Sequence, residues 1–126
     1  TNGKACSEAR AEAAAHAEVY RGSFAISVCP SENVESPTIV GAQAANELLN
    51  IIGIKASFVL TEYNDKIYIS SRSIDEINVQ IIMEKLGGGG HLNVAGAQLE
   101  GVTIVQAKRM IQDTLDEMLK EGDIEE

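Results

Sequence analysis

The 126-residue sequence has no tryptophan, two prolines and only two cysteines, and aromatic residues make up 4% of it. So few rings exclude a surface on which the bases of a single-stranded nucleic acid stack in succession. Cys6 and Cys29 form no CxxC pair and have no histidine at metal-ligand spacing, so we expect two reduced thiols. No apolar run approaches the roughly 20 residues that cross a bilayer.

Basic residues are also scarce, because ten lysines and arginines stand against nineteen aspartates and glutamates, a net charge of −9. Broad binding of nucleic acid needs many cations that displace counterions, so this balance excludes it. The last fourteen residues carry a net −6, which leaves −3 of the total for residues 1–112. We therefore expect a solvated, frayed acidic tail. One small phosphate pocket elsewhere stays compatible with the charge.

Hydrophobic residues make up 44% of the sequence, which is typical of a globular domain. Their periodicity predicts helices over residues 4–20, 37–52, 77–86 and 104–118, and strands over 24–29, 55–62, 66–72 and 97–100. Ser36 is expected to cap a helix, and Thr103 with Gln106 fits a capping box. The order α-β-α-β-β-α-β-α predicts an α/β fold, a single domain with a mixed sheet of about four to five strands flanked by helices.

The least ordinary motif is Gly87-Gly88-Gly89-Gly90-His91, between a predicted helix and a short predicted strand. Ordering four glycines costs more conformational entropy than a plain turn requires. Their N–H groups could converge on an anion, as in phosphate-binding loops, and His91 could donate to a phosphate oxygen. The alternative is a flexible connector with a chance histidine. The spacing matches neither nucleotide-binding glycine fingerprint.

The segment Ser70-Ser71-Arg72-Ser73 ends a predicted strand, where ligand-binding groups often gather in α/β proteins. The guanidinium fork of Arg72 suits a phosphate, and the flanking serines add neutral donors. The alternative is an exposed arginine beside a helix cap, since Ser73 with Glu76 also fits a capping box. Asn93 could contact a base edge or a phosphate, or it could be an ordinary turn residue.

Residues that would complete a catalytic centre are missing. No histidines and acids gather at metal-ligand spacing, and no Ser/His/Asp or Cys/His arrangement stands out among only two histidines. His16 lies in an alanine-rich segment without a second ligand nearby, so we expect a surface or packing role for it. The sequence thus favours a binding domain over a complete hydrolase.

The glycine run with His91, followed by Ala95-Gly96-Ala97, resembles the GGGH…AG motif of the DHH-associated domain. That domain is the carboxyl-terminal substrate domain of the DHH phosphoesterase superfamily, and the resemblance extends from about residue 17 to residue 119. Residues 77–86 and the segment around Arg72 are similar to one branch, the bacterial membrane-anchored cyclic di-AMP phosphodiesterases.

This resemblance implies part of a manganese-dependent phosphodiesterase that hydrolyses cyclic di-AMP to pApA. In that family a separate upstream DHH domain holds two manganese ions, which activate the attacking water. The resemblance assigns substrate contacts to eight residues: backbone donors at Gly88, Gly89 and Gly90, a phosphate or sugar contact at His91, a phosphate clamp at Arg72, and weaker contacts at Ser71, Ser73 and Asn93. No metal ligand is assigned to this chain, which lacks the DHH motif and is expected to be inactive alone.

The resemblance also predicts how the chain is organised. Residues 1–20 would be a lead-in helix or linker from an upstream domain, residues 21–120 the DHH-associated domain, and residues 121–126 an acidic tail. The expected partners are cyclic di-AMP or pApA, the DHH domain of the same polypeptide and, as an option, a second copy in a homodimer. Neither double-stranded nucleic acid nor direct membrane contact is expected of this cytoplasmic domain of a membrane-anchored bacterial protein.

Three other interpretations stay open. The same fold occurs in exonucleases or phosphatases that act on short linear oligonucleotides. It also resembles the carboxyl-terminal domain of alanyl-tRNA synthetases, which aids tRNA binding or dimerisation, although an acidic chain is a poor partner for tRNA. The last alternative is a plain interaction domain with an accidental glycine loop.

Overall fold

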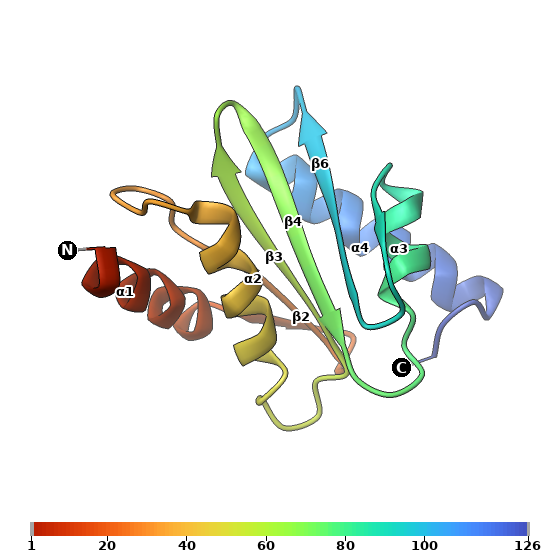
Figure 1. Cartoon of the computed structure of the whole chain (residues 1–126). Helices are drawn as coiled ribbons and strands as arrows, with labels where there is room; N and C mark the ends of the chain where they lie inside the picture. The colour runs from red at the N-terminus through yellow and green to blue at the C-terminus, as the bar shows by residue number, and fades with distance from the viewer. Residues whose placement is uncertain (1, 126) are drawn as a thin grey trace.

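A six-stranded mixed sheet forms the centre of the computed structural model, which describes residues 2–125 (Figure 1). The elements follow the chain as α1 (Asn2–Ala15), β1 (Glu18–Tyr20), β2 (Phe24–Val28), α2 (Pro37–Leu48), β3 (Ala56–Tyr63), β4 (Lys66–Ser73), α3 (Val79–Lys85), β5 (Gly89–Gly90), β6 (Val94–Glu100) and α4 (Ile104–Glu121). Across the sheet the order is β1-β2-β3-β4-β6-β5, with β2 and β3 parallel and the other neighbours antiparallel. The predicted α/β class with a single mixed sheet is confirmed.

Two short strands and one cap differ from the prediction. Helix α1 ends at Ala15, and the residues expected to continue it form β1, which a turn at Arg21 (φ 51°) and Gly22 (φ 77°) joins to β2. The second unexpected strand, β5, lies inside the glycine run, and β6 begins at residue 94 instead of 97. Ser36 precedes α2, but its side chain makes no capping hydrogen bond. Short edge strands carry little periodicity of their own, because pairing with a neighbour defines them.

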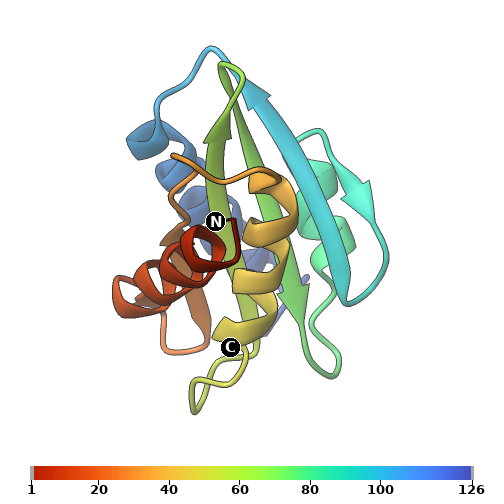
Figure 2. The same cartoon turned by 60° about the vertical axis from the view of Figure 1, so that its left-hand side comes forward.

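Helices cover both faces of the sheet (Figures 1 and 2), and each face has its own apolar core. Helices α3 and α4 enclose the larger core with Phe24, Phe58 and Ile69, whereas α1 and α2 enclose the smaller one. Gly41 brings α2 so close to β3 that a Cβ atom there would lie 2.5 Å from Oγ1 of Thr61. Residues 56–61 of β3 are consequently buried on both faces, which suits their nearly continuous apolar sequence.

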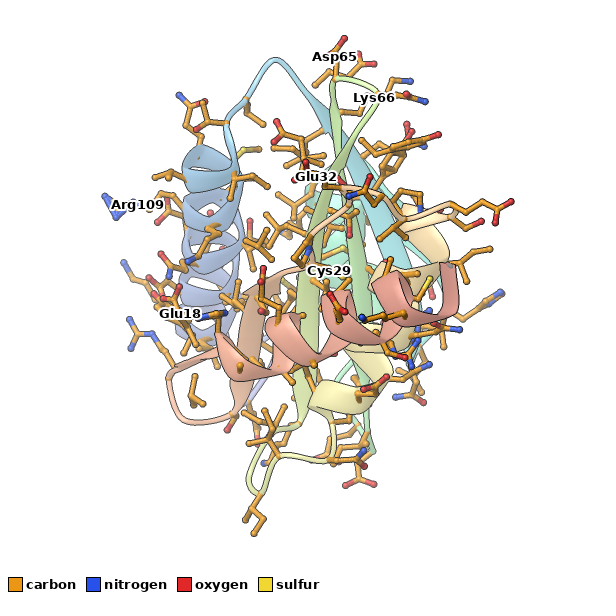
Figure 3. The ribbon with its side chains drawn as sticks, turned by 90° about the vertical axis from the view of Figure 1, so that its left-hand side faces the viewer. Glu18, Cys29, Glu32, Asp65, Lys66 and Arg109 are labelled. Atoms are coloured by element: carbon orange, nitrogen blue, oxygen red, sulfur yellow. The ribbon has the colours of Figure 1, made fainter. Side chains whose placement is uncertain are left out.

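Helix α1 packs on one side only, through the buried Ala9 and Ala13. Its Arg10 forms an ion pair with Glu47 of α2 (2.8 Å) and donates a hydrogen bond to Gln43 (3.1 Å). Figure 3 looks onto this helix and shows Cys29 between it and the sheet. The Cys29 thiol is buried, and burial raises its pKa to about 11. Cys6 and Cys29 are both free thiols, and the raised pKa leaves Cys29 poorly nucleophilic at neutral pH.

Helix α4 is held by both of its ends and by its apolar stripe. The Thr103 side chain accepts from the Gln106 amide (3.1 Å), and the Gln106 side chain accepts from the Thr103 amide (2.8 Å), so the predicted capping box is confirmed. Gly122, at φ 81°, ends the helix, and Ile124 beyond it is buried. The buried stripe of α4 extends as far as Met118. Most of the acids that were expected in a frayed tail therefore lie on an ordered helix.

Asp116, on α4, ties the β1–β2 turn to the helix. Tyr20 donates its hydroxyl hydrogen to this carboxylate (2.8 Å), and Nε of Arg21 donates to it at 2.7 Å. The Arg21 hydrogen bond, followed by that from Tyr20, lowers the pKa of Asp116. A carboxyl with a lowered folded-state pKa stabilises the protein above its unfolded pKa of about 3.9, and that stability is lost as the pH falls further.

We therefore expect wild type to lose stability below about pH 4 more steeply than Asp116→Asn, which has no carboxyl to protonate. The difference is expected to be small, because both partners are partly exposed to solvent. Urea unfolding at several pH values between 3 and 7 measures it. Tyr20→Phe, which removes one of the two donors, should give an intermediate slope. An identical fall in stability at low pH for wild type and Asp116→Asn would contradict the prediction.

Candidate functional site

On the side of the sheet that packs against α1 and α2, β6 has no covering helix and β4 is covered only in part, since Ser70 lies next to Gly41 of α2. Figure 2 shows α2 lying in front of β3 and β4, while no helix crosses β6 on this side. Alternate residues of both strands are buried against α3 and α4, and the residues between them point the other way. We call this second side the uncovered face. Tyr68, Ser70 and Arg72 of β4 lie on it, and so do Gly96 and Gln98 of β6.

The pairing register arranges these residues in rows across the strands. Tyr68 pairs with Gln98, and Ser70 pairs with Gly96, which in turn pairs with Gly89 of β5. The last row joins Arg72 to Val94. Since the His91 amide donates to the Val94 carbonyl (2.7 Å), His91 adjoins the same row. Residues paired side by side share a face of a sheet, so Arg72 and Val94 both lie on the uncovered face, and the backbone of His91 lies on the other side of Val94.

A hollow of about 500 Å³ lies in the uncovered face. It is bounded by the start of α2, by β4 and β6, and by the glycine run, through residues that include Thr38, Tyr68, Ser70, Gly88, Gly96 and Gln98. The positive end of the α2 dipole lies at its edge, since Thr38 belongs to the first turn of that helix. Arg72 lies two residues beyond Ser70 on the same face, about 7 Å along the strand.

Arg72 is the most unusual charge on this face. Of the four arginines, Arg10 and Arg21 form ion pairs and Arg109 is exposed, whereas Arg72 is half-buried with no carboxylate partner among residues 2–125. Its Nη1 donates to the carbonyl of its own neighbour Ser71 (2.9 Å). Burial lowers the pKa of Arg72, although a guanidinium stays charged at neutral pH. A partly desolvated, unpaired cation gains from binding an anion.

The glycine run packs against β6 as an edge strand and does not form an open loop. A Cβ atom on Gly88 would lie 2.0 Å from the Gly96 carbonyl oxygen, and one on Gly90 would lie 2.5 Å from the Cα of Ala95. The Gly88 amide already donates to the Met83 carbonyl (2.8 Å), so it does not converge on an anion as expected. As part of an edge strand, Gly89 and Gly90 keep some backbone groups unpaired by the sheet.

The remaining predicted residues lie around the end of β4, away from the uncovered face. Ser71 is 0% exposed on the opposite face, and its hydroxyl has no hydrogen-bond partner among the described residues. Ser73 is also buried and donates to the Ile77 carbonyl (2.6 Å), while Nδ2 of Asn93 donates to Ser73 (2.9 Å). These bonds fasten the β5–β6 turn to β4. The alternative of Ser73 as a helix cap does not apply, because Asn78 caps α3.

By residue type and motif alone, the sequence does not mark Tyr68 or Gln98 as site residues, and it marks Ser70 only as part of the segment around Arg72. The period of two along a strand places Tyr68 and Ser70 on the face of Arg72, so this signal was available in the sequence. Gln98 carries no such signal, because it joins them through the pairing of β4 with β6. Gly96 was expected to permit a close backbone approach, and a Cβ atom there would indeed lie 2.8 Å from the Ile69 carbonyl oxygen.

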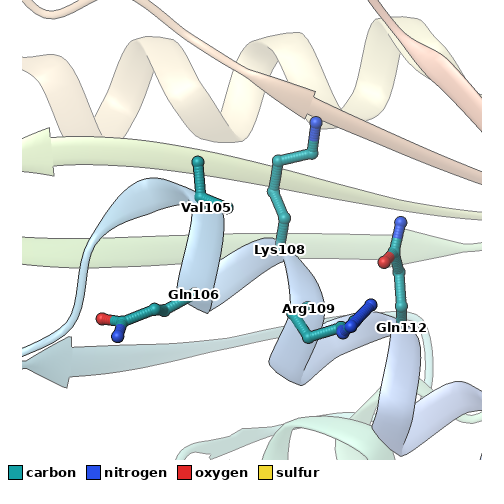
Figure 4. A pocket seen from close by; sticks show the side chains of 5 residues that line it. All are labelled: Val105, Gln106, Lys108, Arg109 and Gln112. Atoms are coloured by element: carbon teal, nitrogen blue, oxygen red, sulfur yellow. The ribbon is translucent and has the colours of Figure 1, made fainter.

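A second hollow, of about 520 Å³, lies along the solvent side of α4 (Figure 4). Its lining residues all come from this one helix, which packs on the opposite face of the sheet from Arg72. No three histidines, cysteines, aspartates or glutamates gather to hold a metal ion within residues 2–125. None of the helices in that range is long and apolar enough to cross a membrane.

Comparison with known families matches residues 22–121 to the DHHA1 domain. The chain belongs to the DHHA1 domain family. Cyclic-di-AMP phosphodiesterase PdeA of Listeria monocytogenes is 47% identical over 100 residues, which cover 79% of this chain and 15% of the relative. Cyclic-di-AMP phosphodiesterase GdpP of Bacillus subtilis is 37% identical over 115 residues, with 90% and 18% covered. The resemblance predicted from the glycine motif is thereby confirmed.

This DHHA1 domain spans less than a fifth of the length of those two relatives. Among solved structures, an exopolyphosphatase-related protein from Bacteroides fragilis has a TM-score of 0.80 at 22% identity. The likeness covers 94% of this chain and 36% of the other, and it supports the fold alone.

Proposed function

We propose that this DHHA1 domain binds the substrate of a manganese-dependent phosphodiesterase that hydrolyses cyclic di-AMP to pApA. Arg72 carries the proposal, because it is a half-buried cation without a carboxylate partner among the described residues, and it lies beside a hollow on the uncovered face. The two cyclic-di-AMP phosphodiesterases that the chain resembles support the substrate class.

A phosphodiester suits Arg72 in both charge and shape. Its two non-bridging oxygens share one negative charge and match the guanidinium fork, which can donate two parallel hydrogen bonds. His91 adjoins the same row of residues and is exposed, so its ring can reach a phosphate or sugar oxygen from the other side of Val94. Gly89 and Gly90 supply backbone donors at the sheet edge in this proposal, whereas Ser71 and Ser73 shape the end of β4 from within the core.

The acidic composition does not oppose a ligand of this size. Acids of the carboxyl-terminal segment, such as Asp113 and Glu117, lie on α4, which packs on the opposite face of the sheet from Arg72. A small nucleotide needs one cation and a few dipoles, while a long nucleic acid needs many cations along its backbone. The charge therefore supports a dinucleotide over double-stranded nucleic acid.

The described residues offer no group of ligands for manganese, so we assign no metal-dependent step to them. In the proposal the two metal ions belong to a DHH domain upstream in the same polypeptide, and this domain positions the phosphate for attack by water. In the proposal residues 1–20 lead in from that domain, residues 21–120 bind substrate and residues 121–126 form an acidic tail. The whole protein is proposed to be anchored in a bacterial membrane with this domain in the cytoplasm, and homodimerisation stays a prediction.

Titration of the ¹⁵N-labelled chain with cyclic di-AMP tests the proposal. We expect chemical-shift changes at the amides of residues 70–72 and 88–91, because they surround Arg72 and the glycine run. Amides of α1 and α4 serve as internal controls and should stay in place. No change at millimolar ligand, or changes confined to α1, would overturn the proposal. Stronger binding of linear pApA than of the cyclic form would favour a short-oligonucleotide exonuclease or phosphatase instead.

A further inference from the structure

The residues that line the hollow differ in chemical character from Arg72, which lies beside it. None of the described residues that line the hollow carries a charge. They offer a phenol ring at Tyr68, hydroxyl groups at Thr38 and Ser70, and a carboxamide at Gln98. Uncharged donors and acceptors beside an aromatic ring suit a neutral, planar, polar group and not a second phosphate.

One row of the sheet, which lines the hollow through Ser70 and Gly96, has almost no side chains. Ser70, Gly96 and Gly89 are paired across three strands, and this row contributes only one hydroxymethyl group. A planar ring can therefore approach the backbone to van der Waals distance. At one end of the hollow, Tyr68 is held by Tyr63, whose ring centroid lies 6.5 Å away at an interplanar angle of 43°.

We propose that this hollow binds the nucleobase of the nucleotide whose phosphate Arg72 holds, and that Gln98 selects adenine. The inference rests on the proposed function. The spacing supports it, because Ser70 and Arg72 are about 7 Å apart along β4, comparable to the separation of base and 5′-phosphate in one nucleotide. Tyr68 then packs against the base, and Tyr63 is a positioning residue for the Tyr68 ring.

In this proposal the carboxamide of Gln98 favours adenine over guanine. A carboxamide donates one hydrogen bond and accepts another at adjacent positions, which matches N7 and the N6 amino group of adenine. Guanine presents two acceptors at the corresponding edge, N7 and O6, and these match an arginine fork. Gln98 is exposed at the rim of the hollow, so its side chain can turn toward a bound base.

Two substitutions at Gln98 test this assignment with the 126-residue chain. Gln98→Leu is expected to raise the dissociation constant of cyclic di-AMP roughly tenfold while leaving that of ribose 5-phosphate unchanged, since this probe lacks a base. Gln98→Arg is expected to shift the ratio of cyclic di-AMP to cyclic di-GMP affinity toward the guanine nucleotide. Gln112→Leu, on α4, is the matched control. It should leave the affinities for cyclic di-AMP, cyclic di-GMP and ribose 5-phosphate as in wild type.

The outcomes separate this inference from the function on which it rests. Equal effects of Gln98→Leu on cyclic di-AMP and ribose 5-phosphate, or no effect on either, would overturn the base-binding assignment. The proposed function would survive that result, provided that wild type still binds cyclic di-AMP next to Arg72. Failure of wild type to bind cyclic di-AMP at all would overturn both. The inference would be supported if Gln98→Leu weakened the binding of cyclic di-AMP but not that of ribose 5-phosphate, and if Gln98→Arg shifted the affinity ratio toward cyclic di-GMP.

Discussion

Arg72→Gln is expected to raise the dissociation constant of cyclic di-AMP by roughly 10- to 100-fold, because hydrogen bonds to a charged group contribute about 1.5–3 kcal/mol. Glutamine keeps a polar group of similar reach but loses the charge and the forked geometry that match a phosphodiester. The thermal stability should stay equal or rise slightly. In the free domain Arg72 makes one hydrogen bond to its own neighbour, and its partly buried charge has no partner among the described residues. Calorimetric titration and thermal unfolding of the same sample measure both quantities.

The matched control for this prediction is Arg109→Gln, which removes the same charge elsewhere. Arg109 projects away from α4 into solvent, as Figure 3 shows, and that helix packs on the other face of the sheet. Its loss changes the net charge equally, so any general electrostatic effect on an anionic ligand appears in both variants. Equal weakening by the two substitutions would remove Arg72 from the site. A large loss of stability in Arg72→Gln would instead indicate a structural role.

Gly88→Ala is expected to destabilise the domain by roughly 3 kcal/mol, which corresponds to a fall of about 10 °C in the melting temperature. The added methyl carbon would lie 2.0 Å from the Gly96 carbonyl oxygen and 2.7 Å from the Cα of Ala97. Both are backbone atoms of β6, which cannot move aside without disturbing the pairing of β4 with β6. Urea unfolding followed by circular dichroism gives the free energy directly.

Gly89→Ala is the matched control within the same glycine run. No atom lies within 4 Å of a Cβ built on Gly89, and its backbone does not require positive φ. We expect its stability to stay within about 1 kcal/mol of wild type. If both substitutions were equally harmless, the tight packing of Gly88 on β6 would be contradicted. If both were equally severe, the run would need glycine for its flexibility and not for close approach.

The elements predicted best are those whose signals are local. The capping box of Thr103 and Gln106 and the apolar stripe of α4 lie within single turns of one helix, and both are found as expected. The hairpin of β3 and β4 follows from two neighbouring strand segments, apolar in β3 and alternating in β4, joined at Asn64 and Asp65, both with positive φ. Strands β1 and β5 are too short to show a period, and β5 consists of two glycines.

The site was only partly predictable for a related reason. Arg72 and the glycine run are unusual by residue type and position, so the sequence alone marks them. Treating Ser71, Arg72 and Ser73 as one cluster ignored the alternation of a strand, which buries the two serines and exposes the arginine to the other side. The sequence pattern indicates glycines with free backbone donors, whereas Gly88 and Gly90 are required because β6 lies directly against them.

The sequence by itself determined the α/β class, the family and the two positions, Arg72 and the glycine run, on which the proposed function depends. Only the tertiary structure decided which face of the sheet stays uncovered and which residues share it. That outcome depends on where α2 packs across β3 and β4, and on the antiparallel pairing that brings Gln98 beside Tyr68. Residues thirty positions apart become neighbours through backbone hydrogen bonds, and local residue patterns carry no record of that pairing.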